Sequence, residues 1–245
     1  MTSSNGEDLS GQATRVAITM GTTEKTVVSV NVGEPRRVMA GGLAVSTAIF
    51  KSPVQGRVAI RDYNLDGDRQ ADLTVHGGRY KAVYLYPSEH YSYWAAELPG
   101  RELSFGMFGE NLTTVGVAEE TTRIGDRFRI GSTILQVTQP RMPCYKLDIR
   151  FDRTDMVKRF WQSGRSGIYF SVVQEGDLAA GDRIDQVASG PEDLTVADVV
   201  RLFNRKENDA VKLRSALRAP LQGGWKEALL ERRGDLLGVS KRRIE

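Results

Sequence analysis

The sequence contains a single cysteine, Cys144, in a short segment that combines a thiol with cationic side chains. The segment reads Gln139-Pro140-Arg141-Met142-Pro143-Cys144-Tyr145-Lys146 and follows a predicted strand. The thiolate is the metal-binding and nucleophilic form of cysteine, and neighbouring cations such as Arg141 and Lys146 favour it. The two prolines stiffen the loop. A buried structural cysteine is the commoner fate of a lone thiol, so both interpretations stay open at this point.

A second segment, His76-Gly77-Gly78-Arg79, comes just before a run rich in tyrosine and valine. Its two glycines allow the backbone to approach a ligand closely, and adjacent amides in such a turn can form an anion-binding nest. His76 and Arg79 add side-chain donors. A glycine turn with an exposed histidine and arginine explains the same residues and is the simpler interpretation of this segment taken alone.

Two more segments carry polar groups that could contact a ligand. Phe108-Gly109-Glu110-Asn111-Leu112 places a carboxylate and an amide between apolar residues, and the Asn111 amide offers donors and an acceptor suited to a heterocycle edge. Without further context, a turn before a strand is the preferred interpretation. Lys51-Ser52 is likewise either a phosphate contact or a turn.

Several common types of site are disfavoured. With two histidines and one cysteine, the chain has no zinc-ligand spacing, and we interpret His90 as a helix-surface residue. No Gly-x-Ser-x-Gly elbow points to a serine hydrolase. Neither a Walker loop nor a Gly-x-Gly-x-x-Gly after a strand is present.

The elements that must position these residues are short strands separated by glycines, with only brief helices. Asp126–Ile130 and Thr133–Thr138 form a predicted hairpin around Gly131-Ser132. Residues 88–98 and 156–162 are predicted helices. Many short strands without regular βαβ alternation predict a mainly β fold with added helices, in which the strands form a closed or nearly closed β-barrel rather than a doubly wound sheet.

The pattern changes after Gly190-Pro191. We expect a disordered N-terminus over residues 1–14, a barrel over 15–190 and a small three-helix domain over 191–245. Thr195 and Asp198 form a predicted capping box at the start of the first of these helices. The other two are predicted over Asp209–Leu217 and Trp225–Arg233.

The composition is that of an ordinary globular protein, with 245 residues, 40% hydrophobic and a net charge of +3. No secretory signal or membrane helix is predicted, and a lone thiol fits a reducing compartment, so we expect a soluble cytoplasmic protein. The mild charge does not indicate nucleic acid binding. The C-terminal helices are ordinary amphipathic helices, although the stretch from Lys226 to Arg243 is rich in basic residues.

Taken together and in order, these segments resemble the MOSC domain, in particular its YiiM-type branch. The resemblance spans roughly residues 25–240 and includes the C-terminal helices. The matching segments are Leu65-Asp66-Gly67-Asp68-Arg69-Gln70-Ala71-Asp72, His76-Gly77-Gly78, Tyr86-Pro87-x-Glu89-His90-Tyr91-x-Tyr93-Trp94, Phe108-Gly109-Glu110-Asn111-Leu112-Thr113 and Gln139-Pro140-Arg141-x-Pro143-Cys144-Tyr145-Lys146-Leu147.

The resemblance implies a β-barrel that binds the molybdenum cofactor, molybdenum held by molybdopterin, with Cys144 as the protein ligand to the metal. A soft thiolate suits a metal that already carries dithiolene sulfur. The anionic pterin phosphate requires cations and backbone amides around it. Glu110 is a candidate proton relay. The candidates for holding the cofactor are Lys51, His76, Gly77, Gly78, Arg79, Asn111, Arg141 and Lys146.

The same resemblance implies a molybdenum-dependent reductase that removes oxygen from small N-hydroxylated compounds, such as N-hydroxylated purines, by two-electron transfer. One cysteine cannot hold an iron–sulfur cluster by Cys₄ ligation, and no flavin fingerprint is present, so an external reductase is expected to supply electrons. The alternative is a cofactor carrier or sulfur-transfer module without reductase activity, although no pyridoxal-phosphate domain is recognisable. A homodimer is compatible with the sequence but is not fixed by it.

Overall fold

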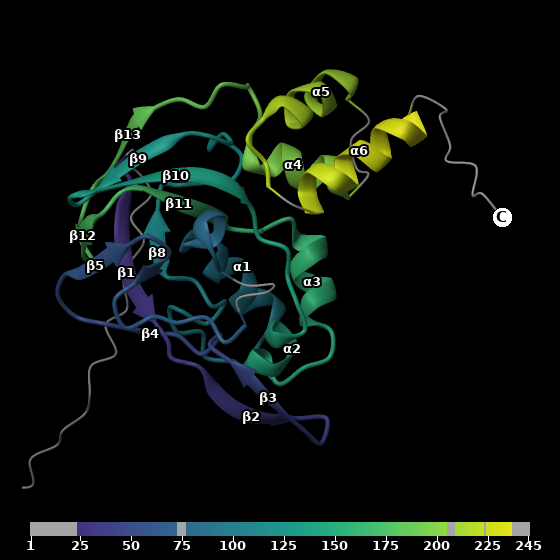
Figure 1. Cartoon of the computed structure of the whole chain (residues 1–245). Helices are drawn as coiled ribbons and strands as arrows, with labels where there is room; N and C mark the ends of the chain where they lie inside the picture. The colour runs from purple at the N-terminus through teal and green to yellow at the C-terminus, as the bar shows by residue number, and fades with distance from the viewer. Residues whose placement is uncertain (1–23, 73–76, 205–208, 223, 237–245) are drawn as a thin grey trace, which may run out of the picture.

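The computed structural model describes residues 24–72, 77–204, 209–222 and 224–236. Its central element is an eight-stranded sheet, with α4–α6 gathered at one end of it (Figure 1). In spatial order the strands are β13 (Ile184–Ala188), β9 (Arg127–Ile130), β10 (Thr133–Pro140), β11 (Ile168–Gln174), β7 (Val83–Pro87), β8 (Leu112–Val115), β1 (Thr26–Val32) and β4 (Ser52–Pro53).

Most neighbouring strands in this sheet are antiparallel. The predicted hairpin of β9 and β10 is confirmed, with Ile130 opposite Thr133, and Gly131 in the turn has a φ of +58°. One pair, β7 and β8, is parallel, and helix α1 (Glu89–Glu97) lies in the connection between them. The sequence pattern did not reveal this βαβ unit, because β8 is only four residues long.

The expected closed barrel is not found among the described residues, where β13 and β4 are the ends of the sheet. The edge of β1 that faces away from β8 forms hydrogen bonds with two different segments. Its last residues pair with β4, whereas Val27 N donates to Asp182 O at 3.0 Å and Ile184 N donates to Lys25 O at 2.8 Å. The sheet therefore curls until its two sides meet at the start of β1, but the strand ladder is not continuous around it.

Two smaller sheets complete the β structure. The hairpin of β2 (Arg36–Ala40) and β3 (Leu43–Thr47) turns at Gly41-Gly42, and a three-stranded sheet has the order β12 (Gly176–Leu178), β5 (Val58–Arg61), β6 (Asn64–Leu65). A 3₁₀ turn, η1 (Arg79–Lys81), occupies the beginning of the tyrosine- and valine-rich run that follows the glycine segment, and β7 begins only at Val83.

The C-terminal helices are α4 (Val196–Phe203), α5 (Ala210–Arg218) and α6 (Gly224–Leu236). Their positions agree with the predicted helices, and the capping box is confirmed, since Thr195 Oγ1 accepts from Asp198 N and Asp198 Oδ2 accepts from Thr195 N. Leu194, Val199 and Leu229 belong to the same buried cluster as the sheet residues. The described helices thus share the core of the sheet instead of enclosing one of their own.

A second buried cluster is rich in aromatic residues and supports the loops around the candidate site. It includes residues of α1, α2 (Lys146–Phe151) and α3 (Met156–Ser163). Phe108 stacks on Tyr86 at a ring distance of 4.7 Å, and Trp94 Nε1 donates to the Tyr86 hydroxyl at 2.7 Å. In the described part of the chain, none of the helices combines the length and apolar character needed to cross a membrane.

Candidate functional site

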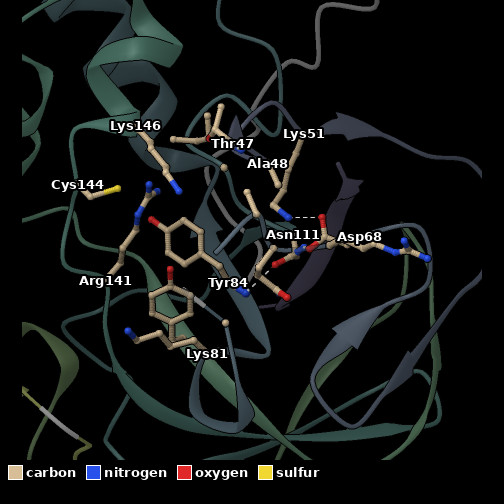
Figure 2. Close-up of a pocket in the computed structure, with 17 residues that line it drawn as sticks. Thr47, Ala48, Lys51, Asp68, Lys81, Tyr84, Asn111, Arg141, Cys144 and Lys146 are labelled. Atoms are coloured by element: carbon tan, nitrogen blue, oxygen red, sulfur yellow. Dashed lines mark hydrogen bonds and ion pairs between the residues drawn. The ribbon is translucent and has the colours of Figure 1, made fainter. Parts of the chain in front are cut away.

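A cavity beside Cys144 brings together most of the candidate residues (Figure 2). Five of the side chains that line it are cationic and one is a carboxylate. The lining consists of Thr47, Ala48, Ile49, Lys51, Asp68, Arg69, Gln70, Ala71, Gly77, Lys81, Tyr84, Gly109, Asn111, Arg141, Cys144, Lys146 and Tyr169.

Cys144 lies in the loop between β10 and α2 and is half-buried. The buried side chain of Arg141 anchors this loop. It donates a hydrogen bond to the Phe108 carbonyl, and its guanidinium lies over the Tyr84 ring at 4.8 Å. The Leu147 N–H then donates to the Cys144 carbonyl at 2.9 Å at the beginning of α2. The backbone around Cys144 is thus held at the cavity wall by the Arg141 side chain on one side and by the beginning of α2 on the other.

Lys146 is the first residue of α2, and its side chain extends into the cavity near Cys144 and Arg141 (Figure 2). The residue is only 8% exposed. Among the described residues, its ammonium has no hydrogen-bond or ion-pair partner. Buried charges in proteins are normally paired, because leaving water is costly for an ion. This ammonium is therefore positioned to bind an anion in the cavity.

The opposite wall is built around Asp68 (Figure 2). Lys51 Nζ forms an ion pair with Asp68 Oδ1, which also accepts from Gly33 N at 2.8 Å. Asn111 Nδ2 donates to Asp68 Oδ2 at 2.9 Å, and Asn111 Oδ1 accepts from Tyr84 N at 3.1 Å. Asn111 thus holds Asp68 against β7, and its amide is already used within the protein. Lys51 is neutralised by Asp68.

Burial shifts several pKa values around the cavity. Desolvation lowers the pKa of Lys51, and Asp68 opposes this effect. Desolvation also lowers the pKa of Lys81, which lines the cavity near Cys144. Burial raises the pKa of Tyr84, whose hydroxyl donates to the Ser166 carbonyl at 2.9 Å. Lys81 therefore combines a lowered pKa with a side chain that is only half-buried.

The residues of the glycine segment, His76 to Arg79, do not all line the same cavity. Gly77 lines the cavity with a φ of +77°, and a Cβ added to it would lie 2.7 Å from the Gln70 side chain. Gly78 and Arg79 do not line this cavity but an adjoining one. His76 lies outside the described residues. The expected anion-binding nest therefore remains a prediction, with Gly77 as its part that reaches the cavity.

Glu110 is not brought to the cavity. It is fully buried and accepts hydrogen bonds from the Tyr91 hydroxyl, Gly106 N at 2.8 Å and Phe108 N at 3.1 Å. These hydrogen bonds stabilise the loop before β8. The geometry therefore does not support the predicted role of Glu110 as a proton relay. His90 also differs from expectation: it is half-buried, and its Nε2 lies 2.9 Å from Glu119 Oε2.

The lining also includes residues that were not among the sequence candidates, and Asp68, Lys81, Tyr84 and Tyr169 are four of them. Asp68 stands in the segment that the MOSC resemblance quoted, but the Leu65-Asp66-Gly67-Asp68 pattern also indicates a turn, and Gly67 does have a φ of +82°. Within the described residues, no group of three or more His, Cys, Asp or Glu side chains could hold a metal ion.

Comparison with known proteins gives consistent matches. The sequence profile of the MOSC domain matches residues 72–185. YflK of Bacillus subtilis is 38% identical over 216 residues, covering 87% of this chain and 97% of YflK. YiiM of Escherichia coli is 37% identical over 190 residues, covering 76% of this chain and 84% of YiiM. A protein named reductase from Gibberella moniliformis is 32% identical over 183 residues, covering 74% of this chain but only 32% of the fungal protein.

Solved structures agree with these matches. The crystal structure of YiiM from Geobacillus stearothermophilus aligns with a TM-score of 0.70 and 33% identity, covering 85% of this chain and 98% of that one. The crystal structure of YiiM from Escherichia coli aligns with a TM-score of 0.67 and 29% identity, covering 88% and 94%. The similarity therefore extends beyond the segment that the domain profile matches.

Proposed function

This chain belongs to the MOSC-domain family and is of the YiiM type, and we propose that its cavity binds the molybdenum cofactor and that the protein reduces N-hydroxylated compounds. The observation that carries the proposal is Lys146, which is 8% exposed and whose ammonium has no hydrogen-bond or ion-pair partner among the described residues, at the same cavity as the thiol of Cys144. A ligand that is both anionic and thiol-binding satisfies the two groups at once. The domain family is generally associated with this cofactor.

The residues of the cavity fit the cofactor chemically. Cys144 offers one soft sulfur ligand, which complements a metal whose other ligands come with the cofactor. Lys146 and Arg141 provide positive charge for a phosphate, and Gly77 allows the backbone to approach closely. Asp68 cancels the charge of Lys51, so the uncompensated charge of the cavity lies on the side of Cys144.

When bound, the cofactor supplies two-electron oxygen removal from an N-hydroxyl group, and the protein supplies binding, orientation and protons. Lys81 is the residue best placed to deliver a proton, since it lines the cavity near Cys144 and burial lowers its pKa. The reductase name of the fungal relative supports oxidoreductase chemistry, although that name describes a much longer protein.

The first experiment is metal analysis of the protein expressed in a host that makes the molybdenum cofactor. We expect near-equal molybdenum and protein in the wild type and little molybdenum in Cys144→Ser, with the fold of the variant unchanged by circular dichroism. Lys146→Ala and Arg141→Ala should also lose cofactor. Lys158→Ala is the matched control, because Lys158 is exposed and does not line the cavity.

The second experiment separates reductase from carrier. N-hydroxylated bases are incubated with the molybdenum-loaded protein and an artificial electron donor, and formation of the reduced base is measured. Turnover that disappears in Cys144→Ser supports the reductase. Full molybdenum occupancy without turnover of any N-hydroxylated compound would instead favour a carrier or sulfur-transfer module. Full occupancy in Cys144→Ser would contradict the ligand assignment itself.

A further inference from the structure

Three arginines gather outside the Cys144 cavity, where the hairpin of β2 and β3 lies beside the end of α2 (Figure 1). Arg36 comes from β2, Arg150 from α2 and Arg101 from the segment after α1. The guanidinium carbon of Arg36 lies 3.5 Å from the centre of the Phe50 ring, and that of Arg150 lies 5.0 Å from the centre of the same ring. We call these three residues the arginine cluster.

Arg101 is connected to the cluster through α2. Its Nη1 donates to the Phe151 carbonyl at 2.6 Å, and its Nη2 donates to the Arg150 carbonyl at 3.3 Å. These are the last carbonyls of the helix, which have no partner within the helix itself. Arg101 therefore stabilises the end of α2, but carbonyl groups do not neutralise its positive charge.

Within the part of the chain that the structure describes, no carboxylate forms an ion pair with any of the three guanidinium groups. Arg150 Nε is also buried without a hydrogen-bond partner. Burial lowers the pKa of Arg150, and the charges of Arg36 and Arg101 lower it further, against a weaker opposing effect of Glu110. Like charges held close together destabilise one another. The cluster therefore lowers stability unless an anion balances it.

The chemistry of the cluster favours a phosphate group over other anions. The planar fork of an arginine can bind two oxygens of a phosphate or a carboxylate at once. A phosphate group carries a charge of about −1.5 to −2 at pH 7 and has three acceptor oxygens, so it balances more of the cluster than a single carboxylate does. Arg101 and Arg150 are half-buried, so a small group reaches them more readily than the surface of another protein.

We propose that the arginine cluster is a phosphate-binding site, separate from the Cys144 cavity, whose ligand is inorganic phosphate or the phosphate group of a phosphomonoester. Arg36 and Arg150 donate hydrogen bonds to the anion, and Arg101 adds charge from the end of α2. The site does not depend on the proposed function, because none of the three arginines lines the cavity at Cys144.

Calorimetric titration of the full-length, cofactor-free protein with inorganic phosphate tests the proposal. The parent for these titrations is Lys146→Met, which removes the anion-binding ammonium beside Cys144. We expect Arg36→Met and Arg150→Met each to weaken phosphate binding by about tenfold or more, because each removes hydrogen bonds between charged groups. Arg37→Met is the matched control and should leave the affinity unchanged. Arg37 is exposed and follows Arg36 on β2, where strand alternation places it on the opposite face.

Thermal unfolding separates an anion site from a cluster that only maintains the fold. Without phosphate, Arg150→Met should have the same Tm as its parent or a higher one, because like charges have been removed. Phosphate should raise the Tm of the parent, since it binds the folded state, but not that of Arg150→Met. Arg150→Lys retains the charge without the fork and should bind phosphate with intermediate affinity.

Titration with AMP, a phosphomonoester, distinguishes the two sources of phosphate. AMP binding that is tighter than phosphate binding and depends on Arg150 would support a phosphomonoester ligand, whereas equal affinities would support a site for inorganic phosphate. Absence of phosphate binding by Lys146→Met would overturn the proposal. So would an affinity that neither Arg36→Met nor Arg150→Met changes, or a lower Tm of Arg150→Met in phosphate-free buffer with the stabilisation by phosphate retained.

Discussion

Replacing Asp68 by asparagine should leave the ammonium of Lys51 buried without an anion. The two residues are 3% and 8% exposed. In the wild type, Asp68 also accepts from Gly33 N at 2.8 Å and from Asn111 Nδ2 at 2.9 Å. An asparagine side chain retains one acceptor oxygen but removes the negative charge. Asp68→Asn therefore tests whether the ion pair, rather than the shape of the side chain, maintains this wall of the cavity.

Two estimates limit the expected loss of stability. Removing one partner of a buried ion pair typically costs about 3–5 kcal/mol. Alternatively, Lys51 loses its proton, and neutralising a lysine of ordinary pKa near 10.5 at pH 7 costs about 5 kcal/mol. We therefore expect the free energy of unfolding to fall by about 3–5 kcal/mol, or Tm by about 6–20 °C for a chain of this length.

The sign of the pH dependence follows from the pKa of Lys51. Burial lowers this pKa, whereas Asp68 raises it, so the substitution should lower it further. Between the lowered pKa of the folded variant and the ordinary 10.5 of the unfolded chain, the unfolded variant binds more protons than the folded one, and stability rises with pH by up to about 1.4 kcal/mol per unit. The difference from the wild type should therefore shrink between pH 7 and pH 9.

Urea unfolding at pH 7, 8 and 9 measures this effect in the wild type, Asp68→Asn, Lys51→Met and the double variant. The double variant should be more stable than the sum of the single losses predicts, and should lack the added pH dependence. Asp66→Asn is the control: Asp66 is 59% exposed and 3.5 Å from Arg61, so it should cost less than about 1 kcal/mol. Additive losses, or the same pH slope in Asp68→Asn and wild type, would refute the reasoning.

Three other substitutions give distinct results. Lys146→Met should leave the thermal stability of cofactor-free protein unchanged or higher while abolishing molybdenum retention, and a large drop in Tm would show that Lys146 is structural. Burial alone would raise the pKa of Asp198, but hydrogen bonds from Lys212 and surrounding residues lower it to about 2, below its ordinary 3.8. Its contribution of about 2 kcal/mol is present above pH 4 and lost as pH falls through 2, so the difference between Asp198→Asn and wild type should shrink on acidification. Gly167→Ala should lower stability by about 2–4 kcal/mol in urea unfolding, because φ is +65° and the new Cβ would lie 2.6 Å from the Tyr84 ring.

The sequence predicted well those elements whose determinants are close along the chain. The β9–β10 hairpin depends on a two-residue turn, and the start of α4 depends on Thr195 and Asp198, three residues apart. The parallel pairing of β7 with β8 and the division of the β1 edge between β4 and Asp182 depend on contacts distant in sequence. Such contacts leave no periodic signal, so the sequence, which predicted a closed or nearly closed barrel, could not show that the strand ladder stays open.

The candidate site was predictable in outline but not in detail. Cys144, Arg141 and Lys146 are neighbours in sequence, and the structure places all three at one cavity, together with Lys51, Asn111 and Gly77. Asp68 and Lys81 were missed, since an Asp-Gly-Asp turn and a lysine before a strand are common on protein surfaces. Only the fold shows that Asp68 is buried against Lys51 and Asn111.

Glu110 and Lys146 show how a polar residue that binds a ligand differs from one that maintains the fold. Both are buried, and both stand in segments that the MOSC resemblance includes. Glu110 accepts hydrogen bonds from donors within its own part of the chain, including Gly106 N and Phe108 N, so no group outside the protein is needed to satisfy it. Lys146 has no such partner among the described residues. Because a charge at a cavity wall is stabilised by an opposite charge, Lys146 is the residue at which we expect an anion to bind, beside Cys144.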